Sequence, residues 1–230
     1  MPGSNVSNDV SSDVLTLPIL YSLQHCPYAM RARMGLMLAQ QPVMLRAVVT
    51  KNKPPEMLAV SPKGTVPVLL LPDNTVIDES LDIMFWALSQ YDPHHLLYVD
   101  VPSAAEEIKN LIDRNDNEFI TRLENYKYSK RHHDFAQLHY RDQCEHFTAH
   151  LEQRLSQHDF LVGDRPSIAD YAILPFIRQF ARVDRQWYLK SPYPNLRRWL
   201  DAQLQQPVFT KVMAKYPQWI TSGEEFLIEV

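Results

Sequence analysis

The stretch HCPYAMRAR, residues 25–33, joins an apolar segment to a helical pattern. The segment before it, LTLPILYS (residues 15–22), is short, apolar and ended by polar residues, which predicts a buried strand. From Met30 onward apolar residues recur at helical spacing, so a helix is expected to begin close to Cys26. Pro27 favours the first position of that helix, because the N–H that proline lacks would have no partner there. Cys26 is then either a reactive thiol or a small buried residue.

The bulk composition excludes several classes of protein. The chain has 230 residues and a net charge of −4, so a general nucleic-acid binder, which needs a basic face, is not expected. No segment approaches the ~20 unbroken apolar residues of a membrane span, so no membrane partner is expected. Residues 1–13 are polar and lack the features of a signal peptide, and we expect a disordered tail there. Two cysteines make no disulfide framework, which favours a cytoplasmic location.

The pattern along the chain predicts two domains. Residues 14–92 favour a mixed α/β domain, residues 93–102 a linker with no periodicity, and residues 103–230 an all-helical domain. In the first domain the expected order is a strand at 15–22, a helix from Met30, strands at 43–49, 65–71 and 75–78, and a helix over 79–91. Residues 50–64 are expected to form a loop, with a short helix started by its prolines. In the second domain one long helix is expected from Ile108 to Leu123 and others further on.

Cys26 is expected at the N-terminus of its helix, where free N–H groups and the positive end of the helix dipole favour a thiolate. A thiolate is the nucleophile of thiol–disulfide exchange. Three residues further on stands Ala29, so no resolving cysteine is at hand, and a catalytic Cys26 needs an external thiol to complete its reaction. The alternative is a cysteine that packs beneath the sheet.

Two further stretches carry candidate binding residues. Pro67 interrupts a strand pattern, where proline normally removes a hydrogen bond of the sheet. A cis Val66–Pro67 bond would resolve the conflict and turn the Val66 backbone outward toward a ligand peptide; the alternative is an edge-strand proline with no such role. Glu79 and Ser80 open a helix and could hold a ligand with α-amino and α-carboxylate groups, or form an ordinary acidic first turn.

Other candidates are weaker. Cys144 lies on an apolar helical stripe and is expected in the core, and no metal site is expected. Three histidines share a helical spacing that could hold a metal but suits a solvated face. A second-substrate pocket is expected to be lined by four aromatic residues, namely Tyr126, Tyr128, Trp187 and Tyr188.

The order of these pieces resembles the cytosolic glutathione transferase superfamily, over nearly the whole chain after the N-terminal tail. As in that family, the chain runs in the order strand, CPYA, helix, strand, KNKP, TVPVL, DES, helix, linker and helices. The CPYA stretch is similar to the cysteine-type members, such as the omega class and its bacterial relatives. The resemblance implies a thioredoxin-like N-terminal domain followed by an all-α domain. SIAD (residues 167–170) resembles the N-capping box of that family, in which Ser167 and Asp170 cap the start of a helix.

The resemblance also implies roles for single residues. Cys26 would face the sulfur of glutathione, and Lys53 would lie near its glycine carboxylate. Val66, before a cis Pro67, would pair with the cysteinyl backbone. The γ-glutamyl end would be gripped by Glu79 and Ser80.

A cysteine in place of the activating tyrosine or serine of other classes favours redox chemistry over conjugation. The expected function is a glutathione-dependent thiol transferase or reductase with glutathione as co-substrate. Its second substrate would be a small disulfide, a protein mixed disulfide, dehydroascorbate or a glutathionyl adduct. The alternatives are conjugation of electrophiles and a non-catalytic binding module of the same fold. By analogy with the family we expect a homodimer.

Overall fold

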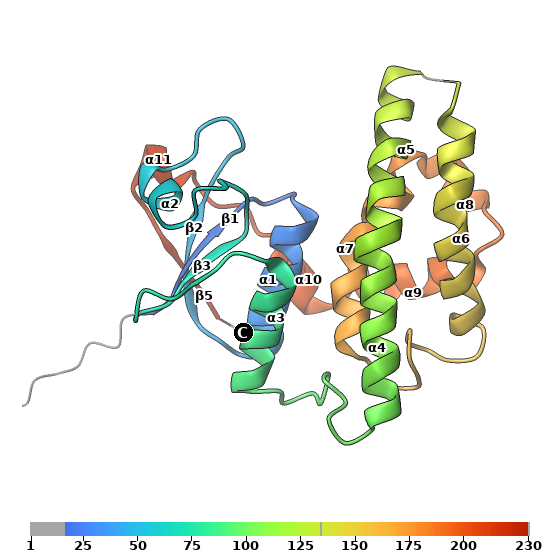
Figure 1. The fold of residues 1–230 in the computed structure, drawn as a ribbon, viewed down its shortest axis with the longest axis horizontal. Helices are drawn as coiled ribbons and strands as arrows, with labels where there is room; N and C mark the ends of the chain where they lie inside the picture. The colour runs from blue at the N-terminus through green and yellow to red at the C-terminus, as the bar shows by residue number, and fades with distance from the viewer. Residues whose placement is uncertain (1–16, 134, 230) are drawn as a thin grey trace, which may run out of the picture.

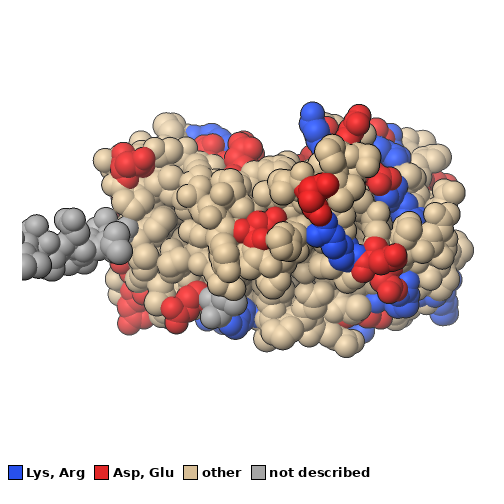
Figure 2. Space-filling view, turned by 90° about the horizontal axis from the view of Figure 1, so that it is seen from below, with Lys and Arg blue, Asp and Glu red and all other residues tan. Residues whose placement is uncertain are grey.

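The computed structural model describes residues 17–133 and 135–229, so the expected tail at 1–13 lies outside the described residues. Figure 1 shows a domain built around a sheet beside a domain of long helices, with α1 and α7 at their junction. No helix among the described residues is both long and apolar enough to cross a bilayer. On the face shown in Figure 2, acidic and basic side chains are intermixed over the helical domain.

A mixed five-stranded sheet forms the centre of the N-terminal domain. Its strand order is β4-β3-β1-β2-β5, with β1 and β2 parallel and the other neighbours antiparallel. Parallel neighbours need a long crossover, and α1 supplies it between β1 and β2. The strands are β1 (Ile19–Ser22), β2 (Val43–Ala47), β3 (Val68–Leu70), β4 (Val76–Ile77) and β5 (Phe226–Ile228).

Helix α1 (Pro27–Leu38) is the most enclosed element of the chain. Every residue from Ala29 to Leu38 is buried, because α1 packs against α3 (Ser80–Gln90) of its own domain and against helices of the second domain. A helix that is apolar on one face only could not occupy this place, and the sequence places alanines, methionines and leucines all around α1. The short α2 (Pro55–Val60) begins at the second of two prolines, as the sequence predicts.

The second domain is helical. Residues 102–132 form one continuous rod of α4 (Pro102–Arg114), a π-helical turn η1 (Asn115–Phe119) and α5 (Ile120–His132). The expected long helix is therefore confirmed, with a π-turn inside it that its apolar spacing does not reveal. The remaining helices are α6 (Gln137–Leu155), α7 (Ile168–Val183), α8 (Arg185–Lys190), α9 (Pro194–Leu204), α10 (Pro207–Val212) and α11 (Trp219–Ser222).

The capping box at the start of α7 is confirmed. The carboxylate of Asp170 is fully buried and accepts four hydrogen bonds of 2.9 Å. Two come from the N–H and hydroxyl of Ser167, and the others come from the Leu161 N–H and the Trp199 indole. Besides capping α7, Asp170 therefore links this helix to α9 through Trp199 and to the preceding loop through Leu161.

The prediction that residues 103–230 are all helical is wrong for residues 226–228, which form the strand β5. β5 returns to the N-terminal domain and pairs with β2 at the edge of the sheet. Its three residues are too few for an alternating pattern to stand out in the sequence. Without this pairing β2 would be the edge strand, and residues 226–228 cover it.

A glycine allows α1 and α3 to approach each other. A Cβ on Gly35 would lie 2.6 Å from the Cγ of Met84 and 2.7 Å from its Cα. The contact is with backbone as well as side chain, so Met84 cannot simply rotate away.

We expect Gly35→Ala to lower the free energy of unfolding by about 1–3 kcal/mol through this overpacking. The direction of this change distinguishes overpacking from helix propensity, because alanine in place of glycine inside an unhindered helix raises the free energy of unfolding by roughly 1 kcal/mol. Urea denaturation measures the change. The matched control is Gly163→Ala, since the nearest atom to its new Cβ is the Tyr98 hydroxyl at 3.9 Å. A stabilised Gly35→Ala protein would contradict the described packing of α1 on α3.

Candidate active site

Cys26 is the N-cap residue of α1, and Pro27 occupies the first helical position. The Cys26 carbonyl accepts the Met30 N–H at 2.9 Å, so the cysteine joins the helix through its backbone. Its thiol makes no capping hydrogen bond and lies 3.9 Å from the carbonyl oxygen of Val66. The side chain is half-buried, whereas Cys144 is fully buried in the core. Burial raises the pKa of Cys144 to about 12, so that thiol stays protonated and inert at neutral pH.

A buried cation lies behind the loop that carries Cys26. The guanidinium of Arg33, on α1, donates to the carbonyls of Leu23 at 3.2 Å and Gln24 at 2.7 Å, in the loop before Cys26. It also donates to Ser22 Oγ at 2.5 Å and to the Val212 carbonyl at 3.0 Å. All four acceptors are neutral. Burial lowers the pKa of Arg33 to about 10, and a negative charge on Cys26 acts in the opposite direction.

The neighbouring arginine of α1 has a different environment. Arg31 is 1% exposed and forms a bidentate ion pair with Asp116 of η1, with N–O distances of 2.6 and 2.8 Å. Its Nε also donates to the Ala172 carbonyl of α7, and its guanidinium lies over the Phe176 ring. The charge of Arg31 is therefore neutralised, whereas Arg33 has no carboxylate partner within the part of the chain that the structure describes.

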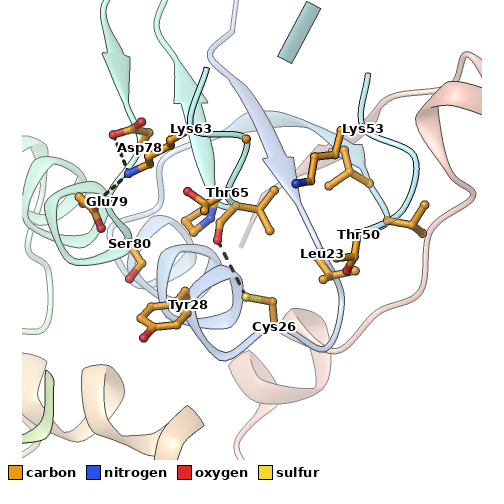
Figure 3. A pocket seen from close by; sticks show the side chains of 15 residues that line it. Leu23, Cys26, Tyr28, Thr50, Lys53, Lys63, Thr65, Asp78, Glu79 and Ser80 are labelled. Carbon is orange, nitrogen blue, oxygen red and sulfur yellow. Dashed lines mark hydrogen bonds and ion pairs between the residues drawn. The ribbon is translucent and has the colours of Figure 1, made fainter. Parts of the chain in front are cut away.

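A cavity of about 600 Å³ opens beside Cys26. It collects all of the expected glutathione-site residues into one place, and Figure 3 shows Lys53 on one side, Glu79 and Ser80 on the other, and Cys26 between them. The Val66–Pro67 bond is cis, as the sequence predicts. The cavity lining includes Cys26, Lys53, Val66, Pro67, Glu79 and Ser80.

Lys63, which the sequence analysis missed, also lines the cavity. Its ammonium lies 2.5 Å from Glu79 and 3.2 Å from Asp78 (Figure 3). Partial burial lowers the pKa of Lys63, but the hydrogen bonds to Glu79 and Asp78 outweigh this effect and raise it. Desolvation likewise raises the pKa of Asp78, and hydrogen bonds from Ser61 and Lys63 outweigh it and lower it. Lys63 follows a proline in a loop, and nothing in its local sequence distinguishes it from a surface lysine.

The four aromatic residues expected around a second substrate do not form a common wall. Tyr126 is 0% exposed and Tyr128 is 62% exposed, although both belong to α5. Tyr126, Trp187 and Tyr188 each contact the ring of Phe180, so these three pack in and around the core. Tyr28 is instead the aromatic residue that lines the cavity of Cys26.

Chemically, this site can hold an elongated polar ligand across a thiol. The Lys53 ammonium, which forms no ion pair among residues 17–133 and 135–229, suits a carboxylate, and the opposite end offers the carboxylate of Glu79 and the Ser80 hydroxyl at the start of α3. Among the described residues, no three or more His, Cys, Asp or Glu side chains are grouped so that they could hold a metal ion.

Comparison with known proteins agrees with this geometry. Residues 20–95 match the family model of the glutathione S-transferase N-terminal domain, and residues 106–202 match that of the C-terminal domain. Glutathione S-transferase omega-1 of Mus musculus is 28% identical over 82% of this chain and 77% of its own. Elongation factor 1-gamma of Danio rerio is 24% identical over 71% of this chain, which spans 37% of that protein.

Solved structures show the same fold. A glutathione transferase family member from Pseudomonas fluorescens, solved with two glutathione molecules bound, superposes with a TM-score of 0.76 at 19% identity, over 88% of this chain and 95% of that one. The two family models together cover most of the chain, and they agree with its thioredoxin-like sheet domain and its helical second domain. The chain belongs to the glutathione S-transferase superfamily.

Proposed function

We propose that this protein is a glutathione-dependent thiol transferase or reductase in which Cys26 is the catalytic nucleophile. The observation that carries the proposal is the position of Cys26: it caps α1, lies at an open cavity, and has no second cysteine beside it, since Cys144 is buried in the core. A monothiol in this place can form a mixed disulfide with glutathione but cannot resolve it internally. The similarity to the omega-1 transferase supports the same subclass.

The cavity offers a group for each part of glutathione. Lys53 would bind the glycine carboxylate, the Val66 backbone would pair with the cysteinyl residue, and Glu79 with Ser80 would hold the γ-glutamyl end. The similar transferase from Pseudomonas fluorescens contains bound glutathione, which supports glutathione as the co-substrate. No metal takes part in this scheme.

The reaction balances without a further oxidant or reductant. The Cys26 thiolate attacks the glutathionyl sulfur of a mixed disulfide, whose S–S bond breaks as the Cys26–glutathione bond forms, and the substrate leaves as a thiolate. The thiolate of a second glutathione then attacks the glutathionyl sulfur on Cys26. Oxidised glutathione leaves, Cys26 is regenerated as a thiolate, and the proton of the second glutathione goes to the substrate thiolate, which becomes a thiol.

A non-catalytic role is the second candidate. The similarity to elongation factor 1-gamma, a protein named for translation, is the observation that favours it. Conjugation of electrophiles is a third possibility, although a Cys26 thiolate would compete with that of glutathione instead of activating it.

The first test replaces each cysteine in turn. Cys26→Ala should abolish exchange of a glutathionylated peptide and the glutathione adduct seen by intact-mass spectrometry, yet leave binding to a glutathione column. Cys144→Ala is the matched control and should retain turnover, because that thiol faces the core. Exchange that survives in Cys26→Ala would contradict the proposal. A wild-type enzyme that conjugates an aryl halide and exchanges no disulfide would favour conjugation, and one that does neither would favour the binding module.

The second test uses the two arginines of α1. Because Arg33 is a buried cation with neutral acceptors, its removal should disfavour a negative charge on nearby Cys26. We expect Arg33→Met to slow alkylation of Cys26 by iodoacetamide at pH 7 about tenfold, equivalent to roughly 1.4 kcal/mol. The control is Arg31→Met combined with Asp116→Asn, which removes the whole ion pair and leaves no unpaired charge beside α1. Both variants lose buried hydrogen bonds, so circular dichroism must show each to be folded at the assay temperature. Equal alkylation rates in Arg33→Met and wild type would contradict this role.

The third test concerns Ser80. No hydrogen bond of its hydroxyl is recorded among the described residues, so its removal should cost the free protein little. Ser80→Ala should weaken glutathione binding by about tenfold or more, since a hydrogen bond to a charged ligand contributes roughly 1.5–3 kcal/mol. Isothermal calorimetry measures the affinity, with Ser89→Ala on the same helix as the control. A loss of thermal stability with unchanged affinity would show that Ser80 serves the fold alone.

A further inference from the structure

Three arginines of the second domain line one cavity. Arg178 and Arg182 belong to α7 and Arg185 begins α8, at sequence intervals of four and three. Arg178 is half-buried beside the ring of Phe209, and the other two are exposed. Within residues 17–133 and 135–229, none of the three takes part in an ion pair, although the chain has more acidic than basic residues.

Two cavities have Arg178 and Arg182 in their linings and therefore adjoin each other. The near cavity, of about 240 Å³, begins at His25 and Pro27, the two residues that flank Cys26 in the chain. The far cavity, of about 430 Å³, extends past Arg185 to an apolar end. We call the two together the arginine groove. The near part is lined by His25, Pro27, Met30, Pro175, Arg178, Gln179 and Arg182, and the far part adds Ala181, Arg185, Tyr188, Leu189, Leu200, Asp201 and Leu204.

The groove is electrostatically unbalanced without a ligand. Burial and, after it, the positive charge of Arg182 lower the pKa of Arg178, because the two guanidinium groups repel each other. The side-chain oxygen of Gln179, which also lines the near cavity, is buried and has no hydrogen-bond partner among the described residues. Asp201, at the far end, is the single carboxylate in the lining. An anion in the near part would relieve the repulsion between Arg178 and Arg182.

We propose that the arginine groove binds an acidic, extended peptide segment of a protein whose glutathionylated cysteine is placed at Cys26. This inference rests on the proposed function and names its substrate class. Arg178 and Arg182 are separated by about 6 Å along α7, at 1.5 Å per residue. Carboxylates two residues apart in an extended peptide lie on the same side, about 6.6 Å apart, and so match the two arginines. The apolar far end would take a hydrophobic side chain that follows the acidic pair.

The lining favours a peptide over a nucleic acid. The three leucines of the far part, Leu189, Leu200 and Leu204, offer no partner to a phosphate backbone, and Asp201 would repel one. Two arginines in a groove that begins at His25 and Pro27, the chain neighbours of Cys26, suit a substrate that carries its own disulfide. A short oligonucleotide is therefore the appropriate competitor in the test.

The test compares three glutathionylated peptides that differ at the second and fourth positions after cysteine, with aspartate, asparagine or lysine there. Wild type should show a KM about tenfold lower for the aspartate peptide than for the lysine peptide at low salt. The difference should shrink at high ionic strength, because salt screens exposed charges. Arg178→Gln with Arg182→Glu should reverse the preference, since it replaces the two arginines that face the acidic pair. Arg131→Glu is the matched control, since Arg131 is an exposed arginine near the end of α5, and should keep the wild-type preference.

A binding measurement separates failure of the groove from failure of the chemistry. Fluorescence anisotropy with the same peptides, S-methylated at cysteine, needs no turnover and uses the folded full-length Cys26→Ala protein. Tighter binding of the aspartate peptide, lost in the double variant, supports the groove even if no disulfide is exchanged. Equal affinity for the three peptides, an unchanged preference in the double variant, or tighter binding of the oligonucleotide would overturn it.

Discussion

The ion pair between Arg31 and Asp116 fixes the helix on which the rest of the site depends. It joins α1 of the sheet domain to the π-helical turn of the helical domain, and the Ala172 carbonyl accepts a third hydrogen bond from the same guanidinium. A paired, fully hydrogen-bonded charge can be buried, whereas removing one partner from such a pair leaves a costly uncompensated charge. Since α1 is held between the two domains, the residue at its N-terminus is held as well. Cys26 therefore owes its position to a contact with the second domain.

Arg31 and Arg33 show how two identical side chains on one helix can serve different ends. Arg31 pairs with a carboxylate. This ion pair holds α1 in position, and its two opposite charges cancel each other's electric field. Arg33 donates hydrogen bonds to carbonyls and a hydroxyl. These bonds orient the loop of Leu23 and Gln24, but the neutral acceptors do not compensate the charge of Arg33. A buried charge acts over a longer distance than an exposed one, because little water screens it. The loop before Cys26 is thus shaped and polarised by the same group.

Local signals allowed much of the fold and site to be predicted. Some residues act on the neighbouring backbone, so their effects can be inferred from sequence. Examples are Pro27 after Cys26, Pro67 within a strand, and Ser167 three residues before Asp170. Partners distant in the chain could not be inferred in this way. Asp116 lies within a helical rod and β5 is three residues long, and neither has a local pattern that reveals its contacts. The roles of Lys53, Glu79 and the other glutathione-site residues came from family resemblance and remain predictions.

The last residues of the chain link the second domain back to the first. Arg46 of β2 lies between the rings of Tyr21 and Trp219 and forms an ion pair with Glu225 at 3.0 Å. The Trp219 indole in turn donates to Glu56, at the start of α2, directly after the loop that carries Lys53. This chain of contacts means that one end of the cavity is supported by residues over 160 positions away. The sheet domain consequently cannot be treated as a separate glutathione-binding unit: without the C-terminal segment, β2 becomes an open edge and the loop of Lys53 loses its support.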